Sequence, residues 1–154
     1  METHSPVANL NSIRVFLAVC WHKGMLNHQC DVDIAFVYGV LEEEVYVYPP
    51  LGVRAGCDQV LKLNCSLYGL KQAAATWNKT VSCVLVDTEF TSFAPDSCIF
   101  VKDTKGSWIY AALYMDDLLI GAEPTGAMDD VIAQLSSRLR MKILWRSVRS
   151  RNRL

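Results

Sequence analysis

The sequence lacks the features that mark membrane, secreted and disordered proteins. No window reaches the roughly 18 uninterrupted apolar residues that a membrane-spanning helix needs. A signal-peptide pattern is also missing, because Arg14 interrupts the first apolar run and His22 and Lys23 close it. Long low-complexity stretches are absent, and charged residues make up only 20% of the chain. We therefore expect a globular, intracellular chain whose 154 residues form one domain.

The cysteine spacing fits neither a zinc site nor a disulfide framework. No two of the six cysteines form a Cys-x-x-Cys pair, and the three histidines fall outside zinc-ligand spacing. Because no secretory signal accompanies these cysteines, we expect free thiols rather than disulfides.

The charges are divided unevenly along the chain. Residues 1–137 carry 8 Lys and Arg against 16 Asp and Glu, a balance of −8, whereas residues 138–154 carry seven basic residues and no acidic one. Proteins that bind nucleic acid tightly usually present a basic face, since contacts to phosphates supply much of the affinity. The acidic body therefore argues against tight nucleic-acid binding by this chain alone.

Apolar periodicity and turn residues predict three helices and six strands. The expected helices are 10–22, 70–87 and about 126–140. The expected strands are 29–38, 44–48, 60–63, 97–102, 108–113 and 118–121. This order predicts an α+β domain with an antiparallel sheet and its helices packed on one face.

Two adjacent aspartates lie in the middle of an apolar run. Residues 109–120 read IYAALYMDDLLI, with Asp116 and Asp117 near the centre. Burying carboxylates among apolar residues is unfavourable unless a cation compensates them. At the tip of a tight hairpin, both carboxylates would project beyond the sheet as hard oxygen ligands suited to Mg²⁺. A solvated hairpin tip explains the same pattern, and the segment alone leaves both interpretations open.

A third carboxylate lies on the predicted strand at 29–38. Asp31 and Asp33 share one strand face, opposite Val32, Ile34 and Phe36. One carboxylate from this strand and two from the hairpin would supply the oxygen donors of a two-metal phosphoryl-transfer site. An edge strand with a wet polar face is the alternative.

These segments resemble the motifs of one polymerase family. Tyr114-Met115-Asp116-Asp117 resembles the Tyr-x-Asp-Asp motif of reverse transcriptases, and residues 29–36 resemble their first catalytic motif. Residues 62–73 resemble the copia-type segment that leads into the central palm helix, and further matches lie at 5–14, 41–52 and 96–101. Several ordered motifs are more specific than any one of them. From about residue 5 to residue 142, the chain is similar to the reverse transcriptase domain of copia-type LTR retrotransposons.

The resemblance implies a palm-like sheet that performs RNA- or DNA-templated DNA synthesis. It implies Asp31, Asp116 and Asp117 as catalytic residues that hold two Mg²⁺ ions, with Mn²⁺ as an alternative metal. The implied partners are an RNA or DNA template with its primer and deoxynucleoside triphosphates (dNTPs), without a membrane. For an intact element the implied location is the cytoplasm, within a virus-like particle.

The resemblance also assigns roles around the incoming nucleotide. It places Phe36 under the sugar, where the ring would exclude a ribose 2′-hydroxyl, although a core aromatic is the alternative. Tyr68 and Gly69 would line the nascent base pair, and Met115 would pack near the primer terminus or simply fill space. The residues assigned to the template and primer are Lys71 and Tyr114, and a solvated helix-start lysine is the alternative for Lys71.

Five positions depart from the copia-type pattern. A basic residue is usual at three of them, a neutral or basic residue at the fourth and Gly at the fifth. These positions are occupied by Asn9, Cys65, Ala75, Asp33 and Glu89. Together the departures suggest relaxed selection.

The resemblance divides the chain into two parts. Residues 5–142 are expected to form a partial reverse transcriptase domain, comprising part of the fingers plus the palm. Residues 143–154 are an unmatched basic tail, expected to be disordered or the product of a frameshift. Thumb and ribonuclease H segments of a full polyprotein are missing, so we expect an incomplete or degenerate copy with little activity of its own.

Two other interpretations stay open at this point. The chain could be a domesticated, non-catalytic module that binds RNA or serves as a scaffold on the palm fold, although such a module gains nothing from three converging carboxylates. It could also be a palm polymerase of another kind, such as a viral replicase, although Phe36 and residues 67–73 speak against that.

Overall fold

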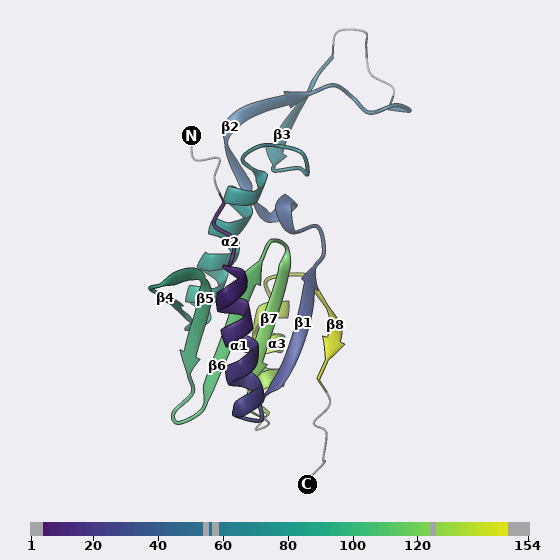
Figure 1. Cartoon of the computed structure of the whole chain (residues 1–154). Helices are drawn as coiled ribbons and strands as arrows, with labels where there is room; N and C mark the ends of the chain where they lie inside the picture. The colour runs from purple at the N-terminus through teal and green to yellow at the C-terminus, as the bar shows by residue number, and fades with distance from the viewer. Residues whose placement is uncertain (1–4, 54–55, 57–58, 124–125, 148–154) are drawn as a thin grey trace. The chain divides into compact units, whose positions relative to one another are not determined.

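The helices and strands fall into two compact units. The structure is a computed structural model that describes residues 5–53, 56, 59–123 and 126–147 (Figure 1). The larger unit contains Pro6–Asp33 and the chain from Val81 onward, and the smaller unit contains Ile34–Thr80. Helix α2 (Ala73–Asp87) continues from the smaller unit into the larger one.

The larger unit is built on a six-stranded antiparallel sheet. Its strand order is β4-β5-β6-β7-β1-β8. The strands are β1 (Leu26–Val32), β4 (Thr91–Phe93), β5 (Asp96–Asp103), β6 (Trp108–Tyr114), β7 (Asp117–Ala122) and β8 (Met141–Arg146). The mixed helix and strand class and the large antiparallel sheet confirm the coarse prediction from sequence.

Helices cover both faces of this sheet, which corrects the expectation of helices on one face. Helix α1 (Leu10–His22) buries Phe16 and Cys20. A Cβ atom added to Gly121 of β7 would lie 2.4 Å from the Cys20 sulfur, so this glycine lets α1 approach the sheet. Helix α3 (Ala127–Ser136) lies behind the sheet in Figure 1 and buries three apolar side chains against it. Both faces of the sheet are apolar at its centre, and each therefore needs a helix to exclude water.

The smaller unit contains a two-stranded ribbon and a short helical turn. The ribbon pairs β2 (Val40–Val47) with β3 (Leu61–Cys65) in antiparallel fashion. The 3₁₀ turn η1 (Ala35–Tyr38) replaces the second half of the strand that we predicted over 29–38. The reason is Ile34, whose φ of 58° takes the chain out of the extended conformation directly after Asp33.

Two strands were missed in the sequence. The three-residue β4 pairs with β5 across a tight turn and is too short to show alternation. Strand β8 corrects the description of residues 143–154 as a disordered tail, because residues 143–146 complete a strand that pairs with β1. The rest of the tail, residues 148–154, lies outside the described residues, as does Cys57. Cys20, Cys30, Cys65 and Cys83 carry free thiols.

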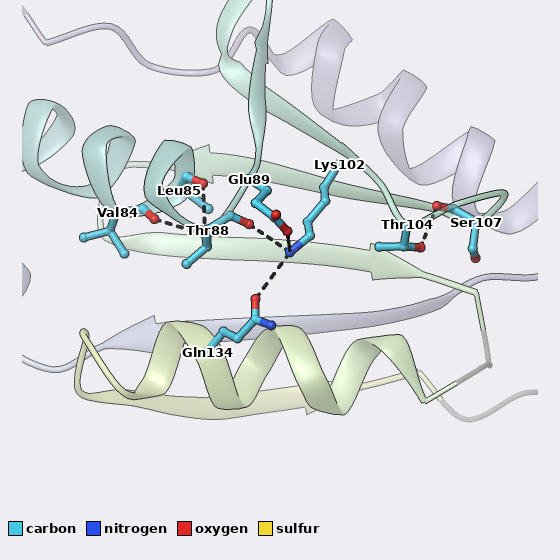
Figure 2. A network of polar contacts seen from close by, with 8 residues as sticks. All are labelled: Val84, Leu85, Thr88, Glu89, Lys102, Thr104, Ser107 and Gln134. Atoms are coloured by element: carbon cyan, nitrogen blue, oxygen red, sulfur yellow. Dashed lines mark hydrogen bonds and ion pairs between the residues drawn. The ribbon is translucent and has the colours of Figure 1, made fainter.

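A buried lysine joins three elements on the α3 side of the sheet. Lys102 of β5 is only 6% exposed, and its ammonium donates to the Thr88 carbonyl at 2.9 Å and to Gln134 Oε1 at 3.3 Å (Figure 2). Glu89 completes the network with an ion pair at 3.2 Å. The cation thereby satisfies a carbonyl just past the C-terminus of α2, where a positive charge is favourable.

We predict that Lys102→Met lowers the free energy of unfolding by about 1–3 kcal/mol. The substitution keeps the apolar stem but leaves the buried Thr88 carbonyl without its donor. Urea unfolding followed by circular dichroism measures the change. Lys79→Met is the matched control, since Lys79 and its partner Glu42 are both exposed and should contribute less than about 1 kcal/mol. Equal stabilities of the two variants would contradict the prediction.

Candidate active site

The two adjacent aspartates lie at a tight hairpin, as the sequence predicted. Tyr114 of β6 and Asp117 of β7 are register partners, so Met115 and Asp116 form the connecting turn. Met115 has a φ of 55°, a conformation that costs free energy in any residue with a Cβ atom. Leu113 and Leu118, both buried, anchor the strands on either side and hold the turn in place.

Strand β1 brings the third predicted carboxylate next to the hairpin. Asp31 is the register partner of Asp117 in the antiparallel β1–β7 pair. Directly opposite residues in such a pair have Cα atoms about 4.5–5.5 Å apart and side chains on the same face. The neighbours Cys30 and Val32 are buried on the opposite face. The fold therefore places Asp31 and Asp117 side by side, although they are far apart in sequence.

The electrostatics of this cluster favour a bound cation. Burial raises the pKa of the Asp117 carboxyl, and the charges of Asp116 and Asp31 raise it further. Gln29 opposes the shift, because its Nε2 donates a hydrogen bond to Asp117 Oδ2 at 3.3 Å. A divalent cation would relieve this repulsion, and carboxylates are the donors that Mg²⁺ prefers.

The fit to a metal rests on the Asp31–Asp117 pair. Within the described part of the chain, no group of three His, Cys, Asp or Glu side chains lies close enough together to hold a metal ion. Asp116 adjoins the pair from the turn, with a half-buried side chain. The convergence of all three carboxylates on shared metal ions stays a prediction.

Strand β8 adds basic residues to the other side of β1. Lys142 is the register partner of Asp31, and its Nζ lies 2.6 Å from Asp33 Oδ1. Arg140 Nε lies 3.5 Å from Asp33 Oδ2, and the Arg140 carbonyl accepts a 2.8 Å hydrogen bond from the Asp33 amide. Asp33 therefore helps to hold the start of β8 beside the strand that carries Asp31. Sequence reasoning missed this role, because it placed Asp33 on the strand face of Asp31 and noted it as a departure from the family pattern, but did not predict the strand that supplies its partners.

Two of the predicted nucleotide-side residues of the smaller unit pack against each other. The rings of Phe36 and Tyr68 pack edge to face, with centroids 4.3 Å apart. Gly69 has a φ of 97°, which explains why a glycine follows Tyr68. Lys71 is exposed. Phe36, Tyr68, Gly69 and Lys71 belong to a different unit from the carboxylates, so their roles there stay predictions.

Comparison with known proteins identifies the family. The profile described as "Reverse transcriptase (RNA-dependent DNA polymerase)" matches residues 1–148. The chain belongs to the reverse transcriptase family. The predicted copia-type resemblance is confirmed, and the reverse transcriptase match continues past Lys142 through β8, where we expected the family pattern to stop.

Its relatives include retrotransposon polyproteins of plants. This reverse transcriptase chain is 35% identical over 143 residues to the retrovirus-related Pol polyprotein from transposon RE2 of Arabidopsis thaliana. The matched region covers 92% of the chain and 10% of that relative. The chain is also 35% identical over 146 residues to the Pol polyprotein from transposon TNT 1-94 of Nicotiana tabacum, with coverages of 93% and 11%. The chain thus spans about a tenth of the length of these curated relatives. Among its described helices, none has the length and apolar character to cross a membrane.

We predict that Asp117→Asn raises the melting temperature by about 1–3 °C in chelator at pH 7. A carboxyl whose folded pKa is raised loses stability as pH rises through its titration, because its ionised form is disfavoured in the folded chain. The gain should therefore vanish at a pH well below the ordinary aspartate pKa of 3.8.

Thermal unfolding measured as a function of pH tests whether Asp117→Asn has the higher melting temperature at pH 7 and loses this difference at low pH. Added Mg²⁺ or Mn²⁺ should stabilise the native chain more than the variant, since the native cluster has one more negative charge to neutralise and one more carboxylate donor. Glu43→Gln, which removes an exposed carboxylate of β2, is the matched control and should change neither quantity. A lower melting temperature for Asp117→Asn in chelator would contradict the prediction.

Proposed function

We propose that the chain carries the nucleotidyl-transfer centre of an RNA-directed DNA polymerase. The proposed substrates are dNTPs and a primer on an RNA or DNA template. The observation that carries the proposal is the register pair of Asp31 and Asp117 beside the Tyr114–Asp117 turn. Membership of the reverse transcriptase family supports the reaction class.

In the proposed mechanism, Asp31, Asp116 and Asp117 hold two divalent cations, Mg²⁺ or Mn²⁺. When bound, the ions would lower the pKa of the primer 3′-hydroxyl and neutralise charge on the triphosphate and the leaving pyrophosphate. The chain contributes the positions of the carboxylates. Backbone pairing fixes the Cα positions of Asp31 and Asp117, so only their side chains need to adjust to receive the cations. Gln29 holds one Asp117 oxygen and so orients that carboxylate.

The sheet of the larger unit is, in this proposal, the palm. The antiparallel pairing of β6, β7 and β1 supports the assignment, since it presents the hairpin turn and Asp31 at the same end of the sheet. Tyr114 and Met115, both exposed at the hairpin, are proposed to face the primer. A non-catalytic scaffold has no use for paired carboxylates that repel each other, so nothing observed favours that alternative.

The residues proposed to select the nucleotide belong to the smaller unit. Phe36 is held by its edge-to-face contact with Tyr68, and such aromatic pairs contribute about 0.5–1.5 kcal/mol beyond area burial. A ring fixed in this way can exclude a 2′-hydroxyl, whereas a mobile ring cannot. Tyr68 and Gly69 are proposed to line the nascent base pair, with Lys71 near the template.

Metal binding provides the direct test of this function. We predict that the native chain binds Mn²⁺ in the presence of dTTP, as followed by electron paramagnetic resonance. Asp31→Asn and Asp116→Asn should each weaken binding at least about tenfold, because each removes an oxygen donor. Glu43→Gln should bind as the native chain does. Equal affinities for native chain and Asp variants would refute the two-metal proposal.

Primer extension with Mg²⁺ or Mn²⁺ then tests the reaction itself. Extension by the 154-residue chain should be slow, because residues 1–137 carry a balance of −8 and template affinity depends on cationic contacts to phosphates. Whatever extension occurs should be absent from Asp116→Asn. Extension that survives in this variant would show that the activity does not belong to the proposed centre.

We predict that Phe36→Ala raises the use of ribonucleotides relative to deoxynucleotides by about tenfold or more. The reason is the loss of a ring proposed to occupy the space of the 2′-hydroxyl. The ratio of kcat/KM for the two nucleotide types in primer extension is the measurement. Phe36→Tyr keeps the ring and should preserve discrimination. An unchanged ratio in Phe36→Ala would reduce Phe36 to a packing residue.

A further inference from the structure

The outer strand β8 lines up two side chains with the carboxylate face of β1. Lys142 is the register partner of Asp31, and Trp145 is the register partner of Gln29. Gln29 and Asp31 are two residues apart on β1 and therefore share a face. Trp145 and Lys142 consequently flank the side of the sheet on which Asp31 and Asp117 lie. The bulge between Gln29 and Cys30 absorbs one extra residue of β8, Leu144, and so keeps Trp145 on this face.

Trp145 and Lys142 of β8, and Arg140 directly before it, remain largely in solvent. Trp145 is 56% exposed, so much of its ring is accessible beside a polar cluster. The side chains of Lys142 and Arg140 are 66% and 78% exposed even though both form ion pairs with Asp33. An exposed tryptophan with two cations farther along the same sheet edge is a combination that suits single-stranded nucleic acid, through stacking on bases and contacts to phosphates.

The spacing also suits a nucleic-acid strand. Two residues along β1 correspond to about 6.6–7 Å. A single strand can extend beyond the 3.4 Å axial rise per nucleotide of duplex DNA, so this offset corresponds to about one or two nucleotides. A base on Trp145 would thus lie about one or two nucleotides from the position that faces Asp31.

We propose that the β8 edge is a binding surface for single-stranded nucleic acid, with Trp145 stacking on a base and Lys142 and Arg140 facing phosphates. This binding surface deepens the proposed polymerase function. It rests on that function only for the idea that the bound nucleic acid leads to Asp31 and Asp117. Trp145 lies beyond the segment from which the family resemblance was recognised in the sequence. An extended peptide that adds a strand to the β8 edge is the competing occupant, since edge strands offer unpaired backbone groups.

Fluorescence anisotropy of a labelled oligothymidylate of twelve nucleotides, measured in chelator, tests the proposal. Trp145→Ala should weaken binding about tenfold, within the range measured for loss of one base–aromatic stack. Trp145→Phe should restore most of the affinity. Trp21→Ala is the matched control, because Trp21 is 84% exposed on α1 and should have no effect. Lys142→Ala should weaken binding and reduce the slope of log Kd against log salt by about one.

Three results would overturn the proposal. These are no binding by the native chain, equal losses in Trp145→Ala and Trp21→Ala, or an unchanged affinity in Trp145→Ala with native circular dichroism. A peptide edge partner is indicated instead if an extended peptide, but not the oligonucleotide, binds in a Trp145-dependent way.

The chelator separates this test from that of the polymerase centre. Asp31→Asn should bind the oligonucleotide at least as well as the native chain, because it removes a negative charge. A native chain that binds the oligonucleotide through Trp145 but does not bind Mn²⁺ would refute the two-metal centre alone. A native chain that binds Mn²⁺ at the aspartates but does not bind the oligonucleotide through Trp145 would refute the β8 surface alone.

Discussion

The pairing of β1 with β7 is the contact on which the larger unit and its candidate site both depend. It places two carboxylates opposite each other, and like charges in opposed positions cost roughly 0.2–1 kcal/mol. On the other face of the same strands, Val32, Leu118 and Ile120 are almost completely buried. Each such side chain contributes about 1.5–3 kcal/mol on burial. The apolar face therefore outweighs the repulsion, and the sheet can hold a charged cluster that would not assemble in isolation.

Three of the five departures from the copia-type pattern have a structural partner. Asn9 caps α1, where its side chain accepts a 2.9 Å hydrogen bond from the Asn11 amide. Asp33 pairs with Lys142 of β8 and with Arg140, which directly precedes that strand. Glu89 has a φ of 69°, which explains the usual Gly, and its carboxylate pairs with Lys102. These residues have specific roles in this fold, which weakens the interpretation of relaxed selection. Nothing in the structure explains Cys65 or Ala75.

The sequence predicted best where a local pattern suffices. The helix expected at 10–22 is α1 with the same bounds, and the hairpin around Asp116 follows from two apolar runs that flank a polar pair. The residues alone left the meeting of Asp31 with the hairpin as one of two interpretations, and only the family resemblance favoured it, because no local spacing fixes the register of distant strands. Strand β8 was missed for the same reason, since its extended form depends on pairing with β1. Nothing in the sequence around Ile34 indicates its left-handed conformation, because a β-branched residue normally favours an extended chain. The strand predicted over 29–38 therefore ran too far.

The strand order also sets when the sheet can be completed during synthesis. Strands β4 to β7 are consecutive in the chain and can pair as they emerge. Strand β1 is made earlier, yet its first partner begins at Asp117, which follows Val32 by 85 residues. At translation rates of about 5–20 residues per second, β1 waits roughly 4–17 s with both hydrogen-bonding edges open. During that interval it can pair with another nascent chain, so the carboxylate cluster forms late and competes with intermolecular association.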